Sequence, residues 1–151
     1  MRKFKRKKGP VRSKKVTVDG IQFASGLEAY MYKALKKAKV KADYEKRTFE
    51  LWRGFYFPDK SYERQANGKG EMVNRGDKKI LGIKYTPDFE GKDFIIECKG
   101  RPNETFPLRW KMFKKYVREN LFGYTLYKPQ KQSECDMVVK LIKNKHKWQE
   151  R

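Results

Sequence analysis

Residues 85–100 contain the side chains of this sequence that are best placed to do chemistry. Asp88 lies at the end of one β-rich run, and Glu97 and Lys99 lie two residues apart near the end of the next run. Gly91 lies among polar residues between the two runs, which is typical of a β-hairpin turn. We therefore expect two antiparallel strands that carry two acids and a lysine.

The expected register pairs Phe89 with Phe94 across a turn at residues 90–93. Side chains alternate between the two faces of a strand. One face then holds Thr86, Asp88, Ile95, Glu97 and Lys99, and the other holds Phe89, Phe94, Ile96 and Cys98. In this register Asp88 and Glu97 are diagonal neighbours about 7–8 Å apart at the backbone, close enough for their carboxylates to converge on one ion.

Two carboxylates beside a lysine suit a divalent-metal site. Mg²⁺ and Mn²⁺ bind oxygen ligands and leave room for water and a substrate phosphate. Lys99 can orient or deprotonate a water, or balance charge in a phosphoryl transition state. In the alternative interpretation Asp88 only ends a strand, and Glu97 and Lys99 belong to an ordinary solvated face. The apolar strand, the Pro-Asp pair and the basic chain favour the site.

These motifs resemble a known enzyme superfamily. Pro87-Asp88 followed by Glu97-Cys98-Lys99 resembles the core motif of the PD-(D/E)XK nucleases. Ser25-Gly26-Leu27-Glu28 opens a helix upstream, which is similar to phage-type endonuclease I, a Holliday-junction resolvase-like nuclease, and to small phage-encoded proteins of the superfamily. The resemblance covers residues 23–127 but neither the basic N-terminus nor the polar stretch after Phe57.

The resemblance implies roles for individual residues. Glu28, Asp88 and Glu97 would be the acidic members of a metal site, and Lys99 would be the catalytic lysine. Asp88, Glu97 and the backbone carbonyl of Cys98 would hold Mg²⁺ (or Mn²⁺), with Glu28 completing the site directly or through water. No other cofactor is expected.

The resemblance also implies a fold and an activity. The fold would be α/β (α+β), a central mixed β-sheet flanked by helices with a restriction-endonuclease-like αβββαβ core. The activity would be hydrolysis of DNA phosphodiesters, selective for branched DNA such as four-way junctions, and symmetric junction cleavage would require a homodimer. Alternatives are a nonspecific or nicking nuclease on duplex or flapped DNA, cleavage of RNA, and a basic binding module without catalysis.

Local patterns predict the other elements. Asp19-Gly20 is a turn favoured in two-residue hairpins, and Ser25 with Glu28 fits a capping box. The elements expected are a hairpin over 16–23, a helix over 26–39, a strand over 44–52, a helix from Pro107 to Gly123, a strand over 124–127 and a helix over 133–145, with a strand over 137–142 as the alternative to the last. Capping and metal ligation compete for one carboxylate, so a role in the helix cap alone is the alternative for Glu28.

Two segments lack a regular hydrophobic period. Residues 1–15 form a basic arm that we expect to be disordered alone and to bind phosphates. A solubility tail or, in a eukaryotic protein, a nuclear signal is the alternative. Residues 57–79 are polar and contain three glycines, which predicts a long loop, either a DNA-contact flap or an insertion without a role. We expect residues 16–151 to form a single nuclease domain.

Charge is the outstanding feature of the composition. The 151 residues include 39 Lys and Arg against 18 Asp and Glu, for a net charge of +21. Nine of these cations lie in residues 1–15, and subtracting them leaves +12 for residues 16–151. Such self-repulsion indicates a polyanionic partner, here DNA. The contacts expected are Arg2, Lys3, Lys5, Arg6, Lys7, Lys8, Arg101, Arg109, Lys111, Lys114, Lys115 and Arg118.

The cysteines and the apolar runs exclude other classes. Cys98 and Cys135 are too few for a disulfide framework or a zinc site, so we expect reduced thiols, with Cys98 in the core. No apolar run approaches membrane-spanning length, and the N-terminus lacks the apolar core of a signal peptide. We expect a protein of the cytoplasm, bacterial or of a phage-infected host cell, with no membrane partner.

Overall fold

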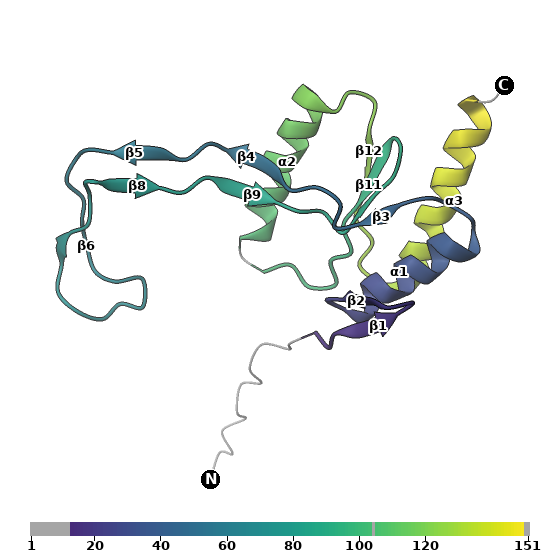
Figure 1. Ribbon diagram of the computed structural model, residues 1–151, viewed down its shortest axis with the longest axis horizontal. Coiled ribbons are helices and arrows are strands. Elements are labelled where there is room, and N and C mark those ends of the chain that lie inside the picture. The colour runs from purple at the N-terminus through teal and green to yellow at the C-terminus, as the bar shows by residue number, and fades with distance from the viewer. Residues whose placement is uncertain (1–12, 104, 150–151) are drawn as a thin grey trace, which may run out of the picture. The chain divides into compact units, whose positions relative to one another are not determined.

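The computed structural model describes residues 13–103 and 105–149 and confirms a mixed α/β fold with three helices and several sheets (Figure 1). The strands are β1 (Val16–Val18), β2 (Ile21–Phe23), β3 (Asp43–Tyr44), β4 (Phe49–Trp52), β5 (Phe55–Phe57), β6 (Tyr62–Glu63), β7 (Val73–Asn74), β8 (Lys78–Ile80), β9 (Ile83–Tyr85), β10 (Phe89–Glu90), β11 (Phe94–Ile96) and β12 (Thr125–Tyr127). The helices are α1 (Gly26–Lys37), α2 (Phe106–Asn120) and α3 (Gln132–Gln149). None of these described helices is long and apolar enough to cross a membrane.

The described chain divides into two compact units. Unit 1 holds residues 13–44, 88–102 and 125–149, and unit 2 holds residues 45–87, 103 and 105–124. The single domain expected for residues 16–151 stays a prediction.

Unit 1 is built on a mixed four-stranded sheet in the order β12-β11-β10-β3. β10 is antiparallel to β11 and to β3, whereas β11 is parallel to β12. α1 and α3 pack on one another, and their apolar residues share a core with one face of the central strands. That face contributes Phe89, Phe94, Ile96 and Cys98, so the predicted core face of the hairpin is confirmed.

The N-terminal hairpin and the first helix form as their local signals predict. Val18 pairs with Ile21, and the two turn residues Asp19 and Gly20 both have positive φ, at 52° and 76°. This is the geometry of a type I′ turn. α1 follows directly, with Ser25 as its N-cap. The C-terminal segment is also helical, as α3, so the alternative strand at residues 137–142 is wrong.

Unit 2 combines α2 with a long two-stranded ribbon, residues 49–85, which we call the β-arm. β4 pairs with β9, β5 with β8 and β6 with β7, all antiparallel (Figure 1). The expectation of a long loop at residues 57–79 holds only in part, because β6 and β7 pair within that stretch while residues 64–72 lie outside any strand. The expected strand over 44–52 is also interrupted: β3 ends at Tyr44 and β4 begins at Phe49.

Candidate active site

The β10–β11 hairpin has a different register from the one predicted. Phe89 pairs with Ile96 and Glu90 with Ile95, and the Gly91 N–H donates to the Phe94 carbonyl at 2.9 Å. The turn is therefore two residues long rather than four. The shift is two residues, so every side chain keeps its predicted face. Continuing the register by one position places Asp88 directly opposite Glu97 instead of diagonal to it.

Gly91 is packed against the Phe94 ring beside the turn. A Cβ atom at this position would lie 2.2 Å from two atoms of the Phe94 ring. The ring therefore occupies the space that a side chain at position 91 would need, and its packing requires glycine there.

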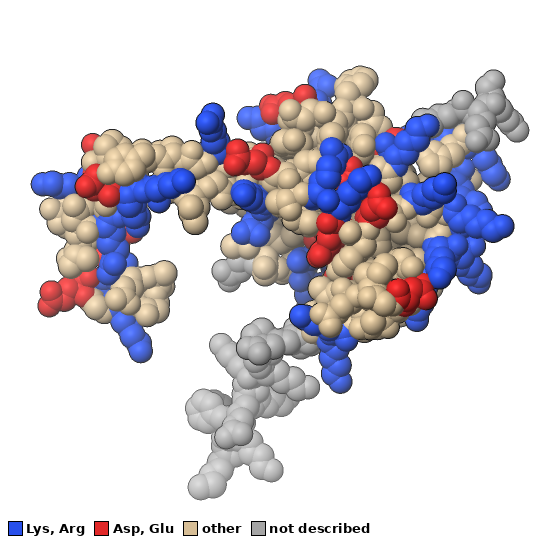
Figure 2. Space-filling view, viewed as in Figure 1, with Lys and Arg blue, Asp and Glu red and all other residues tan. Residues whose placement is uncertain are grey.

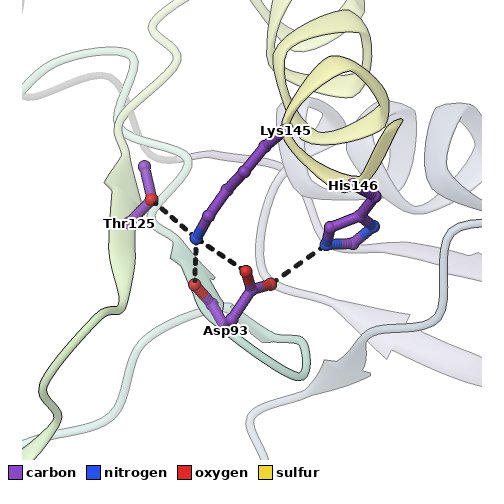
Figure 3. Close-up of polar contacts among 4 residues, drawn as sticks. All are labelled: Asp93, Thr125, Lys145 and His146. Atoms are coloured by element: carbon purple, nitrogen blue, oxygen red, sulfur yellow. Dashed lines mark hydrogen bonds and ion pairs between the residues drawn. The ribbon is translucent and has the colours of Figure 1, made fainter. Parts of the chain in front are cut away.

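The turn is held against the C-terminal part of α3 (Figure 3). The Asp93 carboxylate contacts the Lys145 ammonium at 2.6 Å and His146 Nε2 at 3.1 Å, and Lys145 also donates to the Thr125 hydroxyl at 3.1 Å. Partial burial raises the pKa of Asp93, but its bonds to Lys145 and His146 together outweigh burial and hold this pKa below its usual range. No pattern in the sequence singled out His146, which helps to fix the hairpin through Asp93.

Asp88 and Glu97 lie at the open end of the same hairpin. The Asp88 Oδ2 atom accepts a hydrogen bond from the Cys98 main-chain N–H at 2.6 Å, and Glu97 is buried. The N–H groups of Glu97 and Lys99 donate instead to the carbonyls of Tyr127 and Pro129. These bonds extend the pairing of the chain after β11 with the chain after β12, and they keep this segment extended.

Electrostatics show that the predicted acids are neighbours. Burial, followed by repulsion from Glu97 and then from Glu28, raises the pKa of Asp88 to about 8. The Cys98 N–H and the charge of Lys99 oppose this rise. Unit 1 therefore places Glu28, Glu97 and Lys99 within electrostatic reach of Asp88. A buried acid cluster of this kind favours a bound cation or proton.

Glu28 caps its own helix. The Ser25 hydroxyl donates to Glu28 Oε1 at 2.8 Å, the Glu28 N–H donates to Ser25 Oγ at 3.2 Å, and the Ala24 N–H donates to Oε2 at 3.0 Å. The predicted cap at Ser25 is thereby confirmed, although the Glu28 carboxylate accepts from the N–H of Ala24 and from the Ser25 hydroxyl rather than from the Ser25 N–H. The Tyr44 hydroxyl also donates to Oε2, at 2.7 Å. Tyr44 was not predicted at the site, because only the pairing of β3 with β10 brings it beside α1.

Cys98 has separate roles for its side chain and its main chain. Its thiol is buried in the core and hydrogen-bonded to Cys135, and this bond, followed by burial, raises the pKa of Cys98. Both cysteines are free thiols, as expected. The Cys98 N–H points at Asp88, and in an extended strand the carbonyl of the same residue points to the same side. We therefore expect this carbonyl to lie on the Asp88 side of the strand.

The oxygen atoms present fit a Mg²⁺ ion only in part. Across residues 13–103 and 105–149, no three His, Cys, Asp or Glu side chains form a group that could hold a metal. Mg²⁺, however, often binds one or two carboxylates together with waters and substrate phosphates. Asp88, Glu97 and the Cys98 carbonyl match that smaller set. Glu28 is engaged in capping, and its direct ligation stays a prediction.

The predicted nucleic-acid contacts are distributed over the chain. Arg101 is exposed in unit 1. Unit 2 carries the exposed α2 cations Arg109, Lys111, Lys114, Lys115 and Arg118. Lys115 reaches Glu119 at 3.9 Å. The tail residues Arg2, Lys3, Lys5, Arg6, Lys7 and Lys8 lie outside the described residues.

Comparison with known proteins identifies the family. Residues 7–134 match DUF1064, a family described as proteins of unknown function. The chain belongs to the DUF1064 family. The match includes all four site side chains and the whole β-arm. No curated protein and no solved structure matches the chain.

Proposed function

We propose that this DUF1064 protein is a metal-dependent DNA endonuclease that hydrolyses phosphodiester bonds. The observation that carries the proposal is the cluster at the open end of the β10–β11 hairpin. Glu97 is buried and Asp88 half-buried; burial, followed by repulsion from Glu97, raises the pKa of Asp88 to about 8, and Lys99 lies within electrostatic reach of Asp88. Burying these carboxylates in their ionised form costs free energy, and a bound cation would offset that cost.

The order of elements supports the resemblance to PD-(D/E)XK nucleases. The helices and the strands of the four-stranded sheet follow the chain order α1, β3, β10, β11, α2, β12. This is the αβββαβ order that the resemblance implies. Asp88 directly precedes β10, Glu97 directly follows β11, and Glu28 lies in the first turn of α1.

Each residue has a distinct task in this proposal. Bound Mg²⁺ or Mn²⁺ would polarise the phosphoryl oxygen and lower the pKa of a water. Asp88, Glu97 and the Cys98 carbonyl would bind the ion, and Glu28 would reach it through water while it caps α1. Lys99 would orient the attacking water or offset negative charge in the transition state.

Charge favours DNA as the substrate. A net charge of +21 suits a polyanion, and the exposed cations of α2 and of the β-arm extend that charge into unit 2. The resemblance to endonuclease I makes branched DNA the preferred substrate, cut by a homodimer that carries two sites. A chain that nicks ordinary or flapped duplex DNA is the alternative.

A basic binding module without catalysis is the second candidate. It is favoured by the absence, among residues 13–103 and 105–149, of three side chains that already form a metal site. This candidate predicts DNA binding that does not depend on Mg²⁺ and no cutting.

The test is incubation of the protein with linear, nicked, flapped and four-way-junction DNA, with and without Mg²⁺. We expect Mg²⁺-dependent cutting that Asp88→Asn and Glu97→Gln abolish while DNA binding is retained or tightened. Full activity in either variant would refute the site. Equal cutting of junction and matched linear DNA by a protein with the mass of a monomer would remove only the preference for branched DNA.

A further inference from the structure

The β-arm is a ribbon of two strands along its whole length. Within the described chain, each of its three strand pairs forms a separate two-stranded sheet. Among its strands, β4 packs against α2, whereas the main partner of β5 is β8 and that of β6 is β7. A two-stranded ribbon is marginally stable in water unless something covers a face. The outer part of the arm therefore lacks a layer that would bury its apolar side chains.

Large apolar side chains are exposed on this ribbon. The exposed members are Trp52, Phe55, Tyr56, Tyr62, Met72, Val73 and Leu81. Leu81 is 76% exposed and Tyr62 is 60% exposed, although both lie in a folded segment. Apolar and aromatic side chains gathered on one exposed element indicate a binding surface.

Cations accompany the apolar side chains. Residues 49–85 contain eight Lys and Arg against five Asp and Glu, and several Lys and Arg stand out on the arm in Figure 2. Three of the cations, Arg53, Lys79 and Lys84, line one open hollow of about 870 Å³, in which Glu50 is the sole acid. None of these three cations forms an ion pair with any part of the chain that the structure describes.

The same hollow exposes the main chain. Gly54 and Gly82 also line it. A Cβ on Gly54 would lie 2.6 Å from the Ile80 carbonyl oxygen, and one on Gly82 would lie 2.7 Å from the Trp52 carbonyl oxygen. The two strands therefore approach closely at this point, where a glycine often marks the close approach of another backbone. The hollow is larger than a single phosphate group, so a stretch of polymer backbone fits it better.

We propose that the β-arm binds duplex DNA, with backbone phosphates held in the hollow by Arg53, Lys79 and Lys84. A two-stranded ribbon has the width that the major groove of B-form DNA admits. The exposed aromatic residues contact sugars and base edges beside the phosphates. A protein partner fits less well, because Lys is depleted in protein–protein interfaces. The choice of DNA rests on the proposed function, but the binding itself requires no catalysis.

The experiment measures binding of the full chain to a short fluorescein-labelled DNA duplex, in EDTA, over a range of salt concentrations. The variant R53Q/K79Q/K84Q is compared with K37Q/K140Q/K143Q, which removes the same charge from exposed helix positions of unit 1. We expect the arm variant to bind more weakly and its plot of log K against log salt to be flatter by about 0.9 for each phosphate that it no longer binds. The helix variant should keep the wild-type slope. Equal slopes for both variants would overturn the proposal.

A substitution that is expected to tighten binding serves as a control, because a misfolded variant would not bind DNA more tightly. Glu50→Gln removes the carboxylate of the hollow and should tighten binding, whereas Glu71→Gln at the tip of the arm should not. No tightening by Glu50→Gln would count against the hollow as the phosphate site. If R53Q/K79Q/K84Q binds DNA as tightly as the wild type but differs from it in oligomeric mass in solution, the arm is a protein–protein contact and the proposal is overturned.

Failure of the two proposals is distinguishable. A wild-type protein that binds DNA through the arm but never cuts with Mg²⁺ would refute the nuclease and keep the arm. A protein that cuts equally well and binds with the same salt slope after the three arm substitutions would refute the arm and keep the nuclease.

Discussion

The main-chain N–H of Cys98 donates a 2.6 Å hydrogen bond to the Asp88 carboxylate across the open end of the β10–β11 hairpin. This bond fixes Asp88 beside the chain segment that carries Glu97 and Lys99. Hydrogen bonds to a carboxylate favour its ionised form, yet burial and the two neighbouring acids still raise its pKa to about 8. The ionised form of Asp88 is therefore electrostatically unfavourable in the folded protein.

The raised pKa of Asp88 predicts how stability depends on pH. The unfolded chain releases this proton near its ordinary value of 3.8 and the folded protein near 8. Between these values the folded state holds the extra proton, so the free energy of unfolding falls as pH rises from about 4 to about 8. Asp88→Asn should flatten this fall and raise stability above pH 8 by more than about 1 kcal/mol. Urea unfolding of both proteins across this pH range measures the effect.

Mg²⁺ supplies the control for that prediction. A carboxylate must be deprotonated to bind the ion, so added Mg²⁺ should stabilise the wild-type protein more as pH rises and should stabilise Asp88→Asn little. Equal stabilisation of both proteins by Mg²⁺ at every pH would contradict the proposed ligand.

Lys99 should affect the chemical step rather than affinity. We expect Lys99→Ala to lower the single-turnover cleavage rate by about 10²-fold or more, with little change in DNA affinity. Rates at saturating protein separate the two effects. A variant that binds weakly but cuts at the normal rate once saturated would make Lys99 a phosphate contact.

Substitutions of Glu28 distinguish a role in the helix cap from a role at the metal. Glu28→Gln keeps a side chain that suits a capping box but loses the charge beside Asp88. We expect a melting temperature near that of the wild type and a weaker apparent Mg²⁺ affinity in cleavage. Glu28→Ala, the comparison variant, should also lose about 1 kcal/mol of stability because the cap is broken. Unchanged Mg²⁺ dependence in Glu28→Gln would leave Glu28 with the capping role alone.

Gly91 should be intolerant of a side chain. Gly91→Ala puts a Cβ 2.2 Å from the Phe94 ring, and such overpacking costs about 1–3 kcal/mol. Gly26→Ala, where nothing lies within 4 Å of the new Cβ, is the matched control and should be neutral or slightly stabilising. Similar unfolding free energies for the two variants would contradict the packing described at the turn.

The basic tail should supply affinity without selectivity. Removing residues 1–12 keeps Ser13, whose hydroxyl donates to the Ala24 carbonyl at 3.0 Å. The truncated protein should show a flatter dependence of log K on log salt, by about 0.9 for each duplex phosphate that the tail neutralises, and an unaltered preference among substrates. An unchanged slope would mean that the tail does not touch DNA.

Local sequence determined the elements whose signals lie within a few residues. Asp19-Gly20 specified a type I′ turn because both residues tolerate positive φ, and Ser25 with Glu28 specified a helix start because the two side chains satisfy free N–H groups. The alternation of side chains along the hairpin was also sufficient to place Asp88 and Glu97 on the face opposite the core. The observed register differs from the predicted one by two residues, and such a shift leaves every side chain on its predicted face.

Tertiary structure decided what depends on residues far apart in the chain. Both registers of the hairpin place the same side chains on the core face. The observed register is the one in which Phe94 packs on Gly91 and Asp93 contacts α3. Residues 57–79 of the β-arm gave no periodic signal, because a ribbon that no other layer covers does not need alternating apolar residues. Tyr44 reaches Glu28 only after β3 pairs with β10. The raised pKa of Asp88 likewise arises only in the folded chain, where burial and two other acids act on one carboxylate.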